Sequence, residues 1–422
     1  MNLSLKIAFV FFFVFISLPL TAQLKHAVPV PINIQDSTVP KQKHSRIRDV
    51  NDELDLIDIV QGAFDKHAKK RVDTGGVKSG KLRISGLPAA GYTLQTGFAG
   101  VAIANAAFYT SKHEEENQSN ILANLTYSQY KQIIFPIQTN IWTPGNKYNI
   151  SSEIRFVKYP SLTYGLGGHT SLDDGYTIDY SGFRVHAGIL RSVLKDIYAG
   201  VGYNIDYFWN IREVDPSSTK ATDFQKYGLT ETELASGVTL NFLYDNRRNS
   251  INPQNGAYIN VVYRPNFTFL GSDDNWQSLV VDMRKYFRLP FGSDNVLCFW
   301  NYDWLTVAGT PPYLMLPNTG GDAYTNTGRG YIQGRFRGKN MLYAESEYRF
   351  NITNNELIGG VVFVNAESFS EEGSGRFEVI SPGYGAGLRI KLNKFSRTNV
   401  AIDYGFGTGG SRGFFVNLGE VF

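Results

Sequence analysis

Apolar and polar residues alternate along most of the chain from residue 81 onward. Between residues 197 and 207, apolar residues occupy the odd positions, whereas Gly, Asn and Asp occupy the even positions from 200 to 206. Residues 400–406 show the same period. A period of two is that of a β-strand with one apolar and one polar face. The pattern therefore predicts antiparallel β structure over residues 81–422.

About sixteen segments carry this period, and an even number of antiparallel strands closes a barrel with both ends on one side. Within residues 176–192 the apolar positions change from even to odd around Gly182, which predicts a bulge there. The predicted strands are 82–93, 98–110, 119–129, 133–143, 147–159, 176–192, 196–213, 230–244, 256–270, 274–288, 294–310, 339–352, 355–366, 380–392, 397–405 and 412–422.

Short and long connections tend to alternate between these segments. Periplasmic turns of outer-membrane barrels are short and outer loops are long. The long connections, which this rule places on the cell exterior, are 160–175, 214–229, 311–338 and 367–379.

A soluble β-sandwich would show the same period, so the polar rows decide between the two folds. These rows contain charged pairs such as Glu153 with Arg155, which suit a wet barrel interior. The chain is 42% hydrophobic and 19% charged, with 42 Gly, 29 Phe and 25 Tyr. We therefore predict an all-β transmembrane antiparallel barrel of about sixteen strands. The net charge of +3 gives no reason to expect nucleic acid as a partner.

The N-terminal part predicts export. Residues 1–22 have the order of a signal peptide, with Lys6, an apolar core and then Leu20-Thr21-Ala22; a membrane anchor is the alternative. Residues 23–80 are expected to be a periplasmic linker with a short amphipathic helix within 50–71. That helix could plug the lumen, lie on a membrane surface or attach loosely. Residues 81–422 then form a barrel in the outer membrane, surrounded by its lipids.

The first and last predicted strands should form the weakest line in the wall. The first contains a proline, which cannot donate to a ladder, and both contain glycines. We predict that this seam opens laterally; irregular terminal strands without a function are the alternative. The candidate seam residues are Gly86, Pro88, Gly91, Gly413, Gly419 and Phe422.

Four pieces of sequence resemble the BamA/TamA outer-membrane family of the bacterial surface antigen superfamily. They are LPAAGYTLQTGFAGV at 87–101, LYDNRRNSINPQNGAY at 243–258, GRGYIQGRFRGKNMLYAESEYRF at 328–350, and the final Phe422. The resemblance implies a sixteen-stranded barrel that inserts or exports other proteins. It also implies that the sixth outer loop folds into the lumen, anchored by an arginine that pairs with an acidic residue.

The long Gly-rich loop at 311–338 matches that sixth loop. Arg329, Gly330 and Tyr331 match the family motif, whereas Gly328 replaces a branched aliphatic residue. On the next strand but one, the family's Phe-x-Asp is matched by Phe363 and Asn365, with Asn in place of the acid. The expected charged partners of Arg329 are therefore Glu345 or Glu347, with Asn365 a further candidate.

The function implied by the resemblance is insertion or translocation of outer-membrane or surface proteins. Residues 23–80 lack the pattern of a POTRA module, so the expectation is either a periplasmic partner that supplies such modules or a minimal branch of the family with another task. A passive porin-like channel is the alternative function. No catalytic residue, metal site or cofactor is predicted: the cluster of His169, Asp173 and Asp174 suits a solvated loop, and Cys298 is the single cysteine.

Overall fold

The computed structural model describes residues 50–65, 71, 82–93, 96–111, 116–214, 221–291 and 293–422. The predicted signal peptide at 1–22, and most of the predicted linker at 23–80, lie outside the described residues. Residues 47–422 belong to one compact unit.

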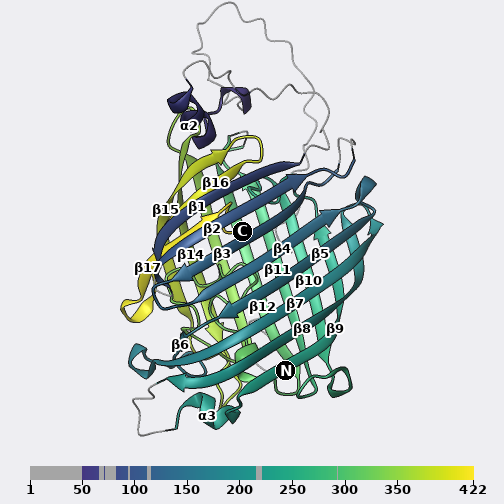
Figure 1. Ribbon diagram of the computed structural model, residues 1–422, viewed down its shortest axis with the longest axis vertical. Helices are drawn as coiled ribbons and strands as arrows, with labels where there is room; N and C mark the ends of the chain where they lie inside the picture. The colour runs from purple at the N-terminus through teal and green to yellow at the C-terminus, as the bar shows by residue number, and fades with distance from the viewer. Residues whose placement is uncertain are drawn as a thin grey trace, which may run out of the picture. The chain divides into compact units, whose positions relative to one another are not determined.

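The described part of the chain is dominated by long strands (Figure 1). None of its helices has the length and hydropathy needed to cross a membrane. The strands are β1 Arg83–Thr93, β2 Gly97–Phe108, β3 Ser119–Ser128, β4 Ile133–Trp142, β5 Tyr148–Lys158, β6 Ser161–Thr163, β7 Tyr176–Leu194, β8 Ile197–Val214, β9 Thr232–Asp245, β10 Gly256–Asn266, β11 Trp276–Arg288, β12 Val296–Ala308, β13 Asn340–Asn351, β14 Ile358–Phe369, β15 Ser381–Asn393, β16 Thr398–Phe406 and β17 Arg412–Leu418. The α-helices are α2 Leu56–Phe64 and α3 Asp223–Gly228, and the 3₁₀ turns are η1 Val50–Asp52, η2 Pro144–Asn146, η3 Leu172–Asp174, η4 Thr268–Leu270, η5 Tyr313–Met315 and η6 Thr408–Gly410.

Every strand of the wall is antiparallel to the strand that follows it in the chain. The ladders run from β1 to β5, from β5 to β7, and onward to β17, while the three-residue β6 also pairs with β7. Apart from β6, this is a meander of sixteen strands, as the sequence predicts. Antiparallel neighbours can be joined by short turns. The segments with a period of two therefore form consecutive strands.

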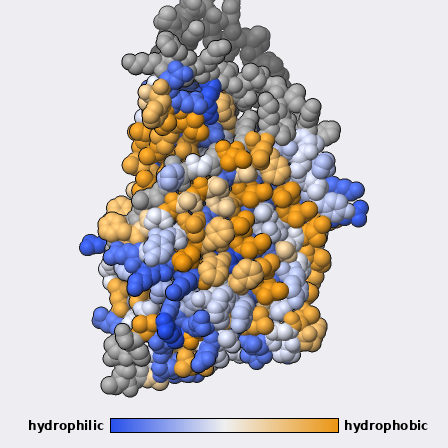
Figure 2. Space-filling view, viewed as in Figure 1, coloured by the Kyte–Doolittle hydropathy of each residue, from blue (hydrophilic) through white to orange (hydrophobic). Residues whose placement is uncertain are grey.

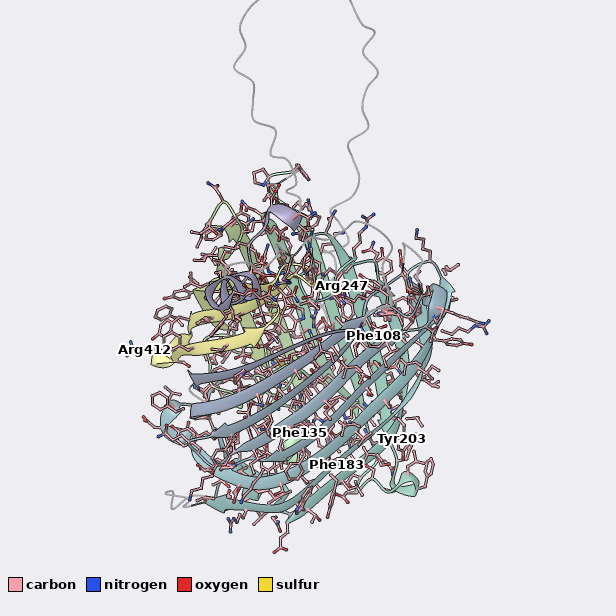
Figure 3. The ribbon with its side chains drawn as sticks, turned by 45° about the horizontal axis from the view of Figure 1, so that its top comes forward. Phe108, Phe135, Phe183, Tyr203, Arg247 and Arg412 are labelled. Carbon is pink, nitrogen blue, oxygen red and sulfur yellow. The ribbon has the colours of Figure 1, made fainter. Side chains whose placement is uncertain are left out.

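The outer face of the wall is apolar. Large apolar side chains on neighbouring strands point away from the interior, and Figure 2 shows hydrophobic residues gathered over the strands. Phe135 on β4 and Phe183 on β7 are 38% and 41% exposed, and both are marked on the wall in Figure 3. Such a surface is stable when lipid rather than water surrounds it.

The change of phase in β7 has a different cause from the predicted bulge. Gly182 pairs in register with Val157 and Phe208, and the irregularity of the β7–β8 ladder lies just before it, between Asp179 and Ser181, with the extra residue on β8. Ile178 is buried and packs in an interior apolar cluster that includes Tyr313 of the long loop. The even-numbered apolar residues therefore face the interior.

Two predicted strands end earlier than expected. The strand predicted at 256–270 stops at Asn266 and is followed by the 3₁₀ turn η4. The strand predicted at 412–422 stops at Leu418, and Gly419 has a φ of +98°, a backbone conformation that favours glycine. The chain then turns inward, so Phe422 packs 5.1 Å from the Trp300 ring and does not line the seam.

Candidate functional site: the loop anchor in the lumen

The connection between β12 and β13 folds into the interior. From Pro311 to Gly338 most residues are buried, and the exposed ones are residues 323–325. At that point the Ala323 carbonyl accepts a hydrogen bond of 2.8 Å from Gln138 of β4 and another from Arg155 of β5. The loop therefore reaches from β12 and β13 to a distant part of the wall.

The loop holds its own shape through a short side-chain cap. Asp322 Oδ1 accepts from the main-chain N–H groups of Asn326 and Thr327, each at 2.8 Å. This cap leads directly into Gly328-Arg329-Gly330-Tyr331. Gly330 has a φ of +116°, and a Cβ added there would lie 2.6 Å from the Phe406 carbonyl oxygen. Only glycine fits this close approach to β16 without displacement of the backbone.

Arg329 is the centre of the site. Its guanidinium bonds to Glu345 and Glu347 of β13 and, at 2.6 Å, to Asp403 of β16. The Arg329 side chain is 1% exposed, and it also lies 3.8 Å from the centroid of the Phe363 ring. Burial alone would lower the pKa of Arg329, but the surrounding carboxylates raise that pKa well above its ordinary value.

The neighbouring motif residues fix the main chain around Arg329. Asn365 does not contact the guanidinium; its Nδ2 donates to the Arg329 carbonyl at 2.9 Å. The Tyr331 hydroxyl donates to the Pro382 carbonyl at 2.6 Å and accepts from the Thr408 N–H at 3.0 Å. Charged and neutral contacts together hold the loop against β14, β15 and β16.

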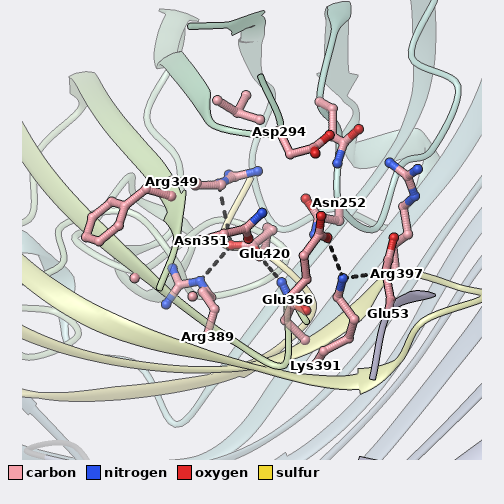
Figure 4. A pocket seen from close by; sticks show the side chains of 16 residues that line it. Glu53, Asn252, Asp294, Arg349, Asn351, Glu356, Arg389, Lys391, Arg397 and Glu420 are labelled. Atoms are coloured by element: carbon pink, nitrogen blue, oxygen red, sulfur yellow. Dashed lines mark hydrogen bonds and ion pairs between the residues drawn. The ribbon is translucent and has the colours of Figure 1, made fainter. Parts of the chain in front are cut away.

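The charged cluster extends beyond the predicted residues. Arg389 of β15 bonds to Asp403 and, at 2.7 Å, to Glu420. Arg349 of β13 bonds to Glu347 and lies 3.4 Å from Glu420. Arg349, Arg389 and Glu420 line a small cavity of about 50 Å³, drawn in Figure 4. Arg329, Arg349 and Arg389 therefore each have carboxylate partners, which such an interior requires.

Sequence reasoning missed Asp403, the third carboxylate of the anchor. Asp403 lies three strands beyond β13, and the curvature of the wall brings the two inward faces together on one guanidinium. The available signal was parity, since Asp403 occupies a polar position between the apolar Ile402 and Tyr404. The odd or even position of a residue along its strand predicts whether its side chain points inward. It does not predict which inward side chains meet across the lumen.

The two terminal strands approach each other without a ladder between them (Figure 1). Within the described residues, the registers pair β1 only with β2, and β17 only with β16. Gly86, Pro88 and Gly91 lie on β1, Gly413 lies on β17, and Gly419 follows its end. The β17 strand has 7 residues, whereas β1 has 11.

The family of the chain follows from a comparison of its sequence with known protein families. The Omp85 superfamily domain matches residues 117–422. The chain belongs to the Omp85 superfamily. The resemblance to BamA-type barrels is thus confirmed at the level of the superfamily, and the Omp85 barrel is an outer-membrane protein.

A solved BamA structure has the same fold, and two CdiB structures are also similar to this chain. BamA from Haemophilus ducreyi lacking POTRA domains 1–3 is 13% identical, with a TM-score of 0.51 over 80% of this chain and 70% of that chain. CdiB from Acinetobacter baumannii is 14% identical, with a TM-score of 0.48 over 82% and 66%. CdiB from Escherichia coli is 9% identical, with a TM-score of 0.49 over 77% and 58%. This chain thus spans less than two thirds of either CdiB chain. No curated protein matches the chain significantly.

Omp85 barrels are not enzymes, and the two described histidines, His169 and His186, have other contacts. His169 lies 3.5 Å from Glu378 on the exterior, while Asp174 accepts a hydrogen bond from the Ser171 N–H. His186 of β7 contacts Asp206 of β8 at 3.0 Å in the interior. In the described ranges, no group of three or more His, Cys, Asp and Glu side chains is arranged to hold a metal ion.

Proposed function

We propose that this Omp85 barrel assists the insertion or translocation of other outer-membrane or surface proteins. The observation that carries the proposal is the pair of strand edges at β1 and β17. Neither edge forms a ladder with the other across the described residues. A strand edge presents unpaired N–H and C=O groups, to which an incoming strand can add.

The composition of β1 supports opening at this line. Pro88 has no N–H to donate, and Gly86 has no side chain to pack against a neighbouring strand. A short last strand offers few hydrogen bonds to be broken. Separation of β1 from β17 therefore costs less than separation of any pair joined by a full ladder.

The loop anchor adjoins the seam. Asp403 belongs to β16, which is the neighbour of β17, and Gly330 packs against Phe406 at the end of the same strand. In this proposal the anchored loop keeps the wall beside the seam rigid while β1 moves. Client proteins and a periplasmic partner with POTRA-like modules are the binding partners that this function requires.

A passive channel is the competing function. The buried loop between β12 and β13 stands across the lumen, from Gln138 to Asp403, which disfavours free flow of solute. Planar-bilayer recordings distinguish the two functions. Discrete, long-lived openings of the wild-type protein would favour the channel.

Proteoliposomes test the insertion directly. Unfolded outer-membrane β-barrel is added to vesicles with and without this protein, and its folded fraction is read from the gel shift between heated and unheated samples. The proposal predicts faster folding with the protein present. Equal rates in both vesicle preparations would contradict it. Purification from the native membrane would then identify the periplasmic partner.

A further inference from the structure

The helix α2 presents its apolar side outward. Its apolar residues are at positions 56, 57, 59, 60, 63 and 64, which form one broad face of the helix, opposite Asp58. Ile59, Val60 and Phe64 are 41%, 52% and 90% exposed. A helix that packed on the barrel for its own stability would bury this face, so the face is made for another apolar surface.

The polar side of the same helix is tied to the barrel. Asp55 caps the helix by accepting from the Asp58 N–H at 2.7 Å, and its other oxygen accepts from the Lys394 N–H at 2.8 Å. Lys394 Nζ lies 2.8 Å from the Asp58 carboxylate. Arg71 also bonds to Asp55 at 2.9 Å. Asp55 and Lys394 are both fully buried, so this tether fixes the rotation of the helix about its axis.

Residues before the helix extend the tether into the cavity of Figure 4. Glu53 bonds to Lys391, which also lies 2.9 Å from Glu356, and all three are labelled in that view. The Leu54 N–H donates to the Asn355 carbonyl at 3.0 Å. The tether therefore involves two turns, one between β13 and β14 and the other between β15 and β16.

These are short turns, which mark the periplasmic end of an outer-membrane barrel, and α2 and α3 lie at opposite ends in Figure 1. Ile352, in the same turn as Asn355, is exposed, as is Leu388 on β15. Both belong to the apolar outer surface next to the tether. The residue before α2 is thus bonded to the turn that carries the exposed Ile352, at the end of the apolar outer surface.

We propose that α2 is a membrane-interface helix. Its Ile59, Val60 and Phe64 face enters the phospholipid leaflet at the periplasmic end, while Asp55 and Asp58 hold it to the barrel. An amphipathic helix with one polar and one apolar side binds a bilayer surface in this way. The helix accordingly lies beside the rim and does not plug the lumen.

An environment-sensitive label tests the proposal on the intact protein in vesicles of phosphatidylethanolamine and phosphatidylglycerol. Phe64→Cys and Val60→Cys place a nitrobenzoxadiazole label on the apolar face, and Gln61→Cys places it on the polar face as the matched control. Cys298 is fully buried and does not compete for the label. We expect blue-shifted emission at 60 and 64, with quenching by doxyl-labelled lipid, and neither effect at 61.

Two outcomes would overturn the proposal. One is a label at 64 that aqueous iodide quenches and doxyl-labelled lipid does not, which would place the face in water. The other is a label protected from both quenchers, which would place it against protein. The Asp55→Ala variant of the Phe64→Cys protein adds a second check, because loss of the tether should reduce the lipid quenching.

Discussion

Arg329 and Asp403 form a 2.6 Å ion pair although 74 residues separate them in the chain. Arg329 belongs to the loop after β12, whereas Asp403 belongs to β16, next to the last strand of the wall. Their contact fixes the loop beside the seam that the proposed function requires. A buried guanidinium among carboxylates is strongly orienting, because a buried charge that loses one of its partners is costly.

Replacement of Arg329 tests this anchor. Arg329→Ala leaves three buried carboxylates without a shared cation, and loss of one member of such a cluster costs about 3–5 kcal/mol. We expect the loop to leave the lumen and chymotrypsin to cleave after Tyr324 in intact cells. The matched control is Arg412→Ala, which removes an arginine from the exposed end of β17. Identical cleavage of wild type and Arg329→Ala would exclude the anchor.

Restoration of the acid seen in the BamA/TamA family should harm this protein. Asn365 uses its Nδ2 to donate to the Arg329 carbonyl, and a carboxylate has no such donor. Asn365→Asp would place a charge against a carbonyl oxygen, at a cost of about 1–3 kcal/mol for the unsatisfied group. Thermal unfolding in detergent should show a lower midpoint. A midpoint raised by Asn365→Asp would mean that Arg329 takes a fourth carboxylate instead.

Gly330 tests the close approach of the loop to β16. Gly330→Ala adds a Cβ 2.6 Å from the Phe406 carbonyl at a residue with positive φ, so both strain and collision oppose it. Gly409→Ala is the matched control, because Gly409 has a φ of +64° and no atom within 4 Å of an added Cβ. The backbone strain alone costs about 1–2 kcal/mol. Unfolding midpoints should therefore fall clearly further for Gly330→Ala, and equal falls would argue against the contact.

The pKa of Glu53 predicts one part of the response of the N-terminal tether to pH. Burial raises the pKa of Glu53 above its ordinary value of 4.5, although Lys391 and Arg397 oppose this and Glu356 adds to it. The docked state therefore favours the neutral carboxyl. The contribution of Glu53 to docking should be largest below pH 4.5 and should be lost as the pH rises through its raised pKa.

The rate of trypsin cleavage after Arg71 measures that docking. Glu53→Gln should cleave no faster than wild type at pH 7 and should lose the part of the pH response that Glu53 supplies. Asp55→Ala, which removes the helix cap and the bond to Lys394, should cleave faster. Faster cleavage of Glu53→Gln would show that the ionised pair with Lys391 stabilises the tether.

The strands of this barrel could be predicted from the sequence because their period is local. Each predicted segment needs only its own alternation and the glycines and prolines at its ends. Arg329, Glu345 and Glu347 could be named as well, because the resemblance to the BamA/TamA family implies an arginine anchor in this loop and an acidic partner for it. Asp403 and Glu420 could not, because their meeting with the arginines depends on how the wall curves.

The inward turn of the last residues could not be predicted from the sequence either. Val416 and Phe422 have the same parity, so alternation places them on one face. The positive φ of Gly419 ends the strand between them and sends Phe422 into the interior, against Trp300. Alternation also fails at apolar residues such as Ile178. These residues face the interior, because this barrel has an apolar cluster inside it.

Closure of the seam by a disulfide tests the central claim most directly. Gly86→Cys in β1 is combined in turn with Phe414→Cys, Val416→Cys and Leu418→Cys in β17. The matched control is the pair Ile402→Cys with Val416→Cys, whose residues face each other across the β16–β17 ladder. The account predicts that the seam disulfide stops client insertion in proteoliposomes, that reductant restores it and that the control pair has no effect. Full insertion activity with the seam disulfide formed would contradict it.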